Sequence, residues 1–152
     1  MRITLAAVGR MKRSPLSAAF EDYAKRLTWP LTLKEVEEKR PLPPEQLMAA
    51  EGEALLGALP ADCYLIALEP SGKALSSEAF AALLEKLQDE GRRDVAFVIG
   101  GADGLSAPLL ARSDFKLTLG AMIWPHLLAR VMLAEQLFRA QSILAGHPYH
   151  RA

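Results

Sequence analysis

The sequence of 152 residues has a single cysteine, no net charge and no long apolar run. Cys63 cannot form an internal disulfide, which excludes a disulfide-stapled secreted scaffold, and its apolar surroundings predict a buried thiol. Lys plus Arg and Asp plus Glu each number 18, which excludes a uniformly basic protein that coats nucleic acid. Charges interrupt every apolar stretch and the N-terminus lacks a secretory-signal pattern, so we expect a cytosolic protein without a membrane segment.

The zero net charge arises because regions of opposite sign cancel. Residues 1–40 hold nine basic and five acidic groups, residues 41–100 hold four and ten, and residues 101–152 hold five and three. Both ends are therefore basic and the middle is acidic. Length and an apolar fraction of 51% fit one folded domain over residues 1–152.

Short β-branched apolar runs alternate with longer amphipathic ones. They predict strands at 3–8, 31–36, 63–68, 95–99 and 115–119. The predicted helices lie at 15–28, from after a stiff connector at 41–44 to about 59, from a cap at Ser76 or Ser77 to 90, shortly after Ser106, and at 125–144. Residues 69–73 read as a loop. This alternation predicts an α/β fold, a mostly parallel sheet with helices on both faces. Ligands in such folds bind beyond the carboxyl ends of strands, so the loops there are the places to look for chemistry.

Two of these loops are unusual. Gly100-Gly101-Ala102-Asp103-Gly104 follows a buried strand, and its glycines permit positive φ angles and close approach of a ligand. A tight turn without a ligand would use the same residues. The segment 119–126 is apolar and uncharged where an exposed connector should be polar. It suits either an adenine ring held by backbone groups or a subunit interface.

Charged and aromatic side chains gather elsewhere. The tail His147-Pro148-Tyr149-His150-Arg151 could engage phosphate or a reacting base, although a frayed chain end is the default interpretation. It offers too few ligands for a metal, and we expect none. Glu135 and Arg139 are spaced as a helix-surface pair, and Arg130 is expected to extend its charge to the surface. The first loop carries Arg10, Lys12 and Arg13, either a solvated turn or a phosphate contact.

Residues 100–106, Pro125-His126-Leu127-Leu128-Ala129-Arg130 and the closing His-Pro-Tyr-His-Arg together resemble a known family. Ala7-Val8-Gly9 and Leu68-Glu69-Pro70-Ser71-Gly72-Lys73 fall in the same register. The sequence looks like the SPOUT-class methyltransferases that methylate N3 of a pseudouridine in large-subunit ribosomal RNA. The likeness covers essentially the whole chain, with departures at Ala102-Asp103, where Pro-Glu is frequent, and at Trp124, where the family commonly has an aliphatic residue.

The resemblance implies a SPOUT fold with a C-terminal trefoil knot, a homodimer, and S-adenosylmethionine bound in the knot with the tail beside it. The cofactor contacts it implies are Leu68, Gly100, Leu119, Gly120, Ala121, Met122, Ile123 and Trp124. The apolar loop would then hold adenine while its side chains exclude water. The RNA-binding residues would be Arg10, Lys12, Arg13, Tyr149 and Arg151.

Methylation requires that the acceptor nitrogen lose its proton. A cation favours the resulting anion and a base accepts the proton. Arg139 and Arg151 are the expected cations and His150 the expected base, whereas His126 fits a structural role equally well. A chain this small has little surface for reading RNA sequence, so we expect it to recognise an assembled ribosome, with a second subunit completing each site. Two alternatives remain open: a related enzyme acting on another RNA such as tRNA, and a non-catalytic ribosome-associated module.

Overall fold

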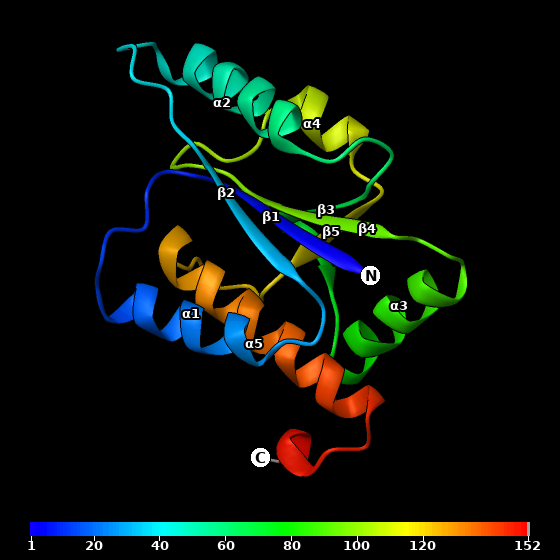
Figure 1. The fold of residues 1–152 in the computed structure, drawn as a ribbon. Helices are drawn as coiled ribbons and strands as arrows, with labels where there is room; N and C mark the ends of the chain where they lie inside the picture. Colours follow the sequence, from blue (N-terminus) through cyan, green and yellow to red (C-terminus); the bar gives the residue numbers. More distant parts are fainter. Residues whose placement is uncertain (152) are drawn as a thin grey trace.

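The computed structural model describes residues 1–151, built around one five-stranded sheet with strand order β2-β1-β4-β3-β5 (Figure 1). All four strand pairs are parallel. The strands are β1 (Arg2–Val8), β2 (Leu31–Val36), β3 (Tyr64–Ala74), β4 (Asp94–Ile99) and β5 (Phe115–Thr118). The helices are α1 (Pro15–Arg26), α2 (Pro44–Ala58), α3 (Ser77–Asp89), α4 (Ala107–Arg112), α5 (His126–Leu144) and the 3₁₀ turn η1 (Pro148–Arg151). The expected parallel α/β sheet is confirmed.

Helices cover both faces of the sheet. Figure 1 shows α2 and α4 on one side and α1, α3 and α5 on the other. The central strands β1 and β4 are buried along nearly their whole length, which explains their continuous apolar runs. Alternate residues feed two cores: Phe97 and Leu133 belong to the core under α5, while Leu65 and Leu109 belong to the core under α2 and α4. Cys63 is buried in the second core, as expected.

Serine caps start three of the helices. Ser14 forms a capping box with Ser17 ahead of Pro15, and the hydroxyls of Ser76 and Ser106 accept hydrogen bonds from the amides of Ala79 and Leu109. These caps satisfy amides that a helix leaves unpaired in its first turn. The serine caps predicted for α1, α3 and α4 are therefore confirmed.

The interpretation of residues 69–73 as a loop is wrong. These residues belong to β3, which runs to Ala74, and both Leu68 and Lys73 pair with Leu117 of β5 across a bulge. The close approach of β5 explains why a glycine, Gly72, lies within this strand. A β-carbon there would lie 2.7 Å from the backbone carbon of Lys116, so only glycine permits so close an approach of the two strands.

Helix α5 starts at the carboxyl edge of the sheet and crosses the molecule (Figure 1). Arg130 does not extend to the surface as expected: it is fully buried, because its guanidinium finds oxygen acceptors at the ends of β1 and β2. Within residues 1–151, the helices are all too short or too polar to span a membrane. The trefoil knot stays a prediction of the resemblance.

Candidate active site

Three of the expected cofactor-binding segments meet at one edge of the sheet. β4, β3 and β5 are adjacent and parallel, so their carboxyl ends lie side by side. Although β3 continues to Ala74, Leu68 pairs with Leu117 of β5 and therefore lies level with the end of that strand. Gly100 after β4 and Leu119 after β5 lie at the same edge. The carboxyl edge is where parallel sheets bind ligands.

The loop between β5 and α5 exposes its apolar side chains. Met122 is 75% exposed, Ile123 92% and Trp124 39%, and these are the large hydrophobic residues that the described chain leaves uncovered. The indole N–H of Trp124 donates to the Leu119 carbonyl at 3.3 Å, which holds the loop in a curl. The chain's own elements do not bury this loop, so its composition calls for an external cover, either a ligand or another subunit.

The glycine turn after β4 is built by close backbone packing. A β-carbon on Gly100 would lie 2.7 Å from the Gly104 carbonyl oxygen, and the Gly104 amide donates to the Gly101 carbonyl at 3.1 Å. Gly104 is the residue of this turn that adopts a positive φ, +85°. Gly100 is thus demanded by the turn itself.

Arg130 ties the first loop to the start of α5. Its guanidinium donates to the Glu35 carboxylate at 2.6 Å and to the carbonyls of Val8 and Gly9 at 3.0 and 2.9 Å. Burial raises the pKa of Glu35, but hydrogen bonds from the Met11 amide and from Arg130 outweigh it and leave that pKa below its ordinary value. Sequence reasoning missed Glu35, because an acidic residue on an edge strand looks like ordinary surface.

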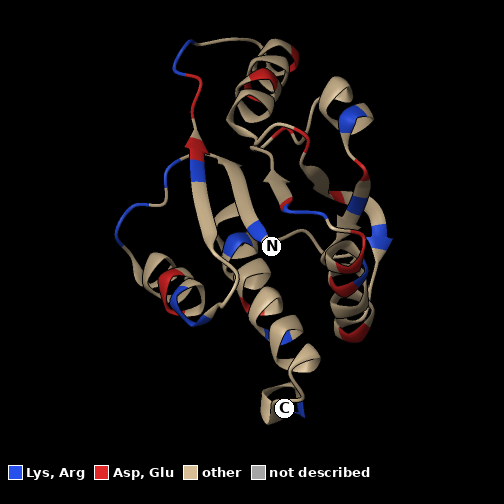
Figure 2. Ribbon diagram, turned by 45° about the vertical axis from the view of Figure 1, so that its right-hand side comes forward, with Lys and Arg blue, Asp and Glu red and all other residues tan. Residues whose placement is uncertain are grey.

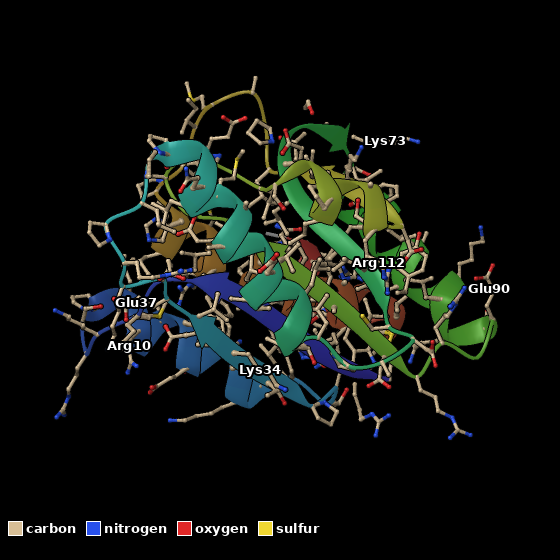
Figure 3. The ribbon with its side chains drawn as sticks, turned by 90° about the horizontal axis from the view of Figure 1, so that it is seen from above. Arg10, Lys34, Glu37, Lys73, Glu90 and Arg112 are labelled. Carbon is tan, nitrogen blue, oxygen red and sulfur yellow. The ribbon has the colours of Figure 1, made fainter. Side chains whose placement is uncertain are left out.

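The expected RNA-binding residues of the first loop lie near this edge. Arg10, Lys12 and Arg13 are exposed after β1, and the side chains of Arg10 and Glu37 lie together, 3.3 Å apart (Figure 3). A β-carbon on Gly9 would lie 3.6 Å from Nε2 of His126, so His126 lies beside the same loop. Figure 2 shows the basic loop between β1 and α1 on one side of the molecule and the acidic residues of α3 on the other.

The C-terminal tail is folded against α5. Glu135 accepts hydrogen bonds from Arg139 at 2.7 Å and from the Tyr149 hydroxyl at 3.1 Å, so the expected helix pair is confirmed and a third member joins it. The Tyr149 ring meets Phe138 edge-on at 4.7 Å, and the Arg26 guanidinium lies 4.2 Å from the Phe138 ring centre. The tail is therefore an ordered part of this helix surface.

The contacts within this cluster raise the pKa of two of its members, Arg139 and Tyr149. The hydrogen bond to Glu135 raises the pKa of Arg139. Burial, together with hydrogen bonds to Tyr23 and Glu135, raises the pKa of Tyr149, so its hydroxyl stays protonated and remains a donor at neutral pH. Nδ1 of His150 is buried and has no hydrogen-bond partner within residues 1–151, and Arg151 is exposed.

A cavity of about 480 Å³ lies between the start of α3, the end of β5 and the middle of α5. Leu119 and Gly120 line it together with Glu135, the residue that binds Arg139 and Tyr149, and with Ser76 at the start of α3. Glu135 is nine residues into α5 from His126, which is about 14 Å along the helix axis. Two of the expected cofactor residues, Leu119 and Gly120, therefore share one cavity with Glu135. The other expected cofactor residues and the expected catalytic residues do not line it. Its size suits a small organic ligand.

Among the described residues, no three His, Cys, Asp or Glu side chains group as metal ligands.

The chain is similar to known proteins over essentially its whole length. A family model described as "Predicted SPOUT methyltransferase" matches residues 1–150. The chain is 53% identical to a "Ribosomal RNA large subunit methyltransferase H" of Rhodospirillum centenum over 100% of both chains, and 51% identical to one of Paramagnetospirillum magneticum over 99% of each.

Two solved structures share the fold. A probable methylase family protein from Haemophilus influenzae aligns with a TM-score of 0.57, covering 97% of this chain and 69% of that one at 12% identity. The SpoU methyltransferase AviRb from Streptomyces viridochromogenes aligns with a TM-score of 0.50, covering 92% and 58% at 13% identity.

Proposed function

Because the chain belongs to the SPOUT methyltransferase family, we propose that it methylates large-subunit ribosomal RNA, with N3 of a pseudouridine as the acceptor. Full-length relatives at about half identity carry the name of that rRNA activity. The acceptor atom is inferred from the His-Pro-Tyr-His-Arg tail. The observation that carries the proposal is the uncovered apolar loop at the carboxyl edge of the sheet, next to a cavity and a basic first loop.

The residues at this edge fit S-adenosylmethionine, which supplies a methyl group on a sulfonium centre when bound; AviRb was solved in complex with it. The backbone of residues 119–124 offers hydrogen-bonding groups for adenine, and the exposed side chains of Met122 and Ile123 would shield it from water. Leu68 and Gly100 flank the loop on neighbouring strands. Binding would bury apolar surface that the free chain leaves in water.

The tail would supply the polar groups for the acceptor. Arg139 is already paired with Glu135, so we assign it to positioning Tyr149, which can stack on a base. Arg151 is exposed and can stabilise a negative charge on the acceptor ring, and His150 is the group that would accept the proton. Arg10, Lys12 and Arg13 would contact phosphates.

We propose that the protein acts as a homodimer, with the tail of one protomer completing the site of its partner. Within one chain, the Tyr149 hydroxyl binds Glu135 in the middle of α5, so the tail does not cover the loop. Ile123 at the loop tip is 92% exposed. A second copy would cover the loop and bring further polar groups to it. The same assembly widens the surface for a folded ribosomal partner in the cytosol.

Titration calorimetry with S-adenosylmethionine tests the cofactor site. Ile123→Glu should weaken binding at least tenfold, because it places a charge where the loop would cover adenine. Ala82→Glu, an exposed change on α3, is the matched control and should bind normally. Unchanged binding by Ile123→Glu would contradict the assigned loop.

Mass mapping of ribosomal RNA from a strain lacking the gene tests the acceptor. A methylpseudouridine should disappear and return with the intact chain, but not with Ile123→Glu. Gly100→Arg is the poorer probe, since it would break the glycine turn. A loss of methylation in tRNA instead, an unchanged map, or equal activity on short free RNA and on ribosomes would each contradict part of the proposal.

A further inference from the structure

Glu51 of α2 is a buried acid that belongs neither to the cofactor-binding residues nor to the catalytic residues. Its residue surface is 7% exposed, and Oε1 has no hydrogen-bond partner within residues 1–151. A buried carboxylate without a partner is costly, and such groups in proteins are usually paired. Glu51 therefore points to an interaction that the chain does not make by itself.

The carboxylate of Glu51 lies against the glycine turn. A β-carbon on Gly101 would lie 3.0 Å from Oε2 and 3.2 Å from Oε1, so these oxygens occupy the space that a side chain at that position would enter. Gly101 adjoins Gly100, and the end of β1 meets the same point through Val8, 3.2 Å from that β-carbon position. Glu51 thus lies at the carboxyl edge and packs against Gly101, the residue that follows the assigned cofactor contact Gly100.

The surroundings of Glu51 are negative. Burial raises its pKa, and the nearby carboxylates of Asp103 and Glu38 raise it further. The described residues form no metal-binding group here. A positively charged hydrogen-bond donor would relieve both the charge repulsion and the missing partner.

We infer that Glu51 binds the ammonium group at the methionine end of the methyl donor, with Asp103 adding to the attraction; this rests on the proposed function. The donor carries two positive centres, the sulfonium and the ammonium. Of these two positive centres, only the ammonium has N–H groups, and an unpartnered carboxylate oxygen requires a donor. Rotation of the carboxyl group about its soft terminal torsion presents either oxygen to the ligand.

Calorimetry with a matched pair of ligands tests this inference. S-adenosylhomocysteine carries the ammonium, and its deaminated analogue differs by lacking it. Glu51→Gln should weaken binding of S-adenosylhomocysteine about tenfold to a hundredfold, the loss expected for a hydrogen bond between charged groups, and should change binding of the deaminated analogue less than threefold. Glu53→Gln, an exposed change two residues along α2, is the control and should bind both normally.

Thermal unfolding of the free variants separates this role from a structural one. Glu51→Gln removes an unpaired buried charge, so its melting temperature at pH 7.5 should equal or exceed that of the wild type. A lower melting temperature with parallel loss of both ligands would overturn the inference in favour of a structural role. If Glu51→Gln binds S-adenosylhomocysteine with wild-type affinity, the role of Glu51 is overturned and the proposed function stands. If the wild-type protein binds neither ligand, the proposed function is overturned as well.

Discussion

Replacing Arg130 by methionine removes the charge that joins α5 to the ends of β1 and β2 while keeping a long apolar side chain in place. Arg130 is fully buried and donates to Glu35, Val8 and Gly9. In Arg130→Met the two carbonyls lose a charged donor, and the Glu35 carboxylate is left without its counter-ion. The variant should therefore unfold more easily.

The expected loss follows from the exposure of the pair. Removing one member of a fully buried ion pair costs about 3–5 kcal/mol. The Glu35 side chain is 29% exposed, so water partly replaces Arg130 there, and we expect a loss near the lower end, about 3 kcal/mol. For a chain of this size that corresponds to a fall in melting temperature of about 6–12 °C.

Urea unfolding followed by circular dichroism measures this loss, with Arg40→Met as the control. Arg40 pairs with Glu38 on the surface, where water screens the pair, so Arg40→Met should leave the free energy of unfolding nearly unchanged. Glu35→Gln in the Arg130→Met background should cost less than it does alone, because it removes the unpaired charge. A loss below 1 kcal/mol for Arg130→Met, or strict additivity in the double variant, would refute this reasoning.

Three further outcomes follow from single contacts. Gly72→Ala should destabilise the protein by about 1–3 kcal/mol, since its β-carbon would meet the β5 backbone, whereas Gly57→Ala, in open space on α2, should stabilise it by about 0.5–1 kcal/mol; urea unfolding compares them. The lowered pKa of Glu35 means that its contribution is complete above its ordinary value of 4.5 and is lost as pH falls through the lowered pKa. The difference in free energy of unfolding between wild type and Arg130→Met should therefore become smaller in acid. A difference that does not change with pH would contradict this role of Glu35. Ser76→Ala removes the α3 cap and should lower the free energy of unfolding by about 1 kcal/mol in thermal unfolding. An unchanged melting temperature would show that the cap does not stabilise the protein.

The candidate site was only partly predictable from sequence. The apolar loop at 119–124 was recognisable because an exposed connector of that composition needs a cover, and the structure leaves Ile123 in water. Glu51 gave no such signal, since an acid between two small residues of a helix looks like ordinary surface. Its burial appears only when α2 packs beside the glycine turn.

The order of strands and helices, their caps and the identity of the two unusual loops could be read along the chain, because hydrophobic period and capping depend on near neighbours. The sheet order β2-β1-β4-β3-β5 could not, and it is this order that places Leu68, Gly100 and Leu119 on one edge. Packing also decided that residues 69–73 belong to a bulged strand and that Arg130 is buried. Strand pairing and the burial of charge depend on groups distant in sequence, so these features exist only in the folded molecule.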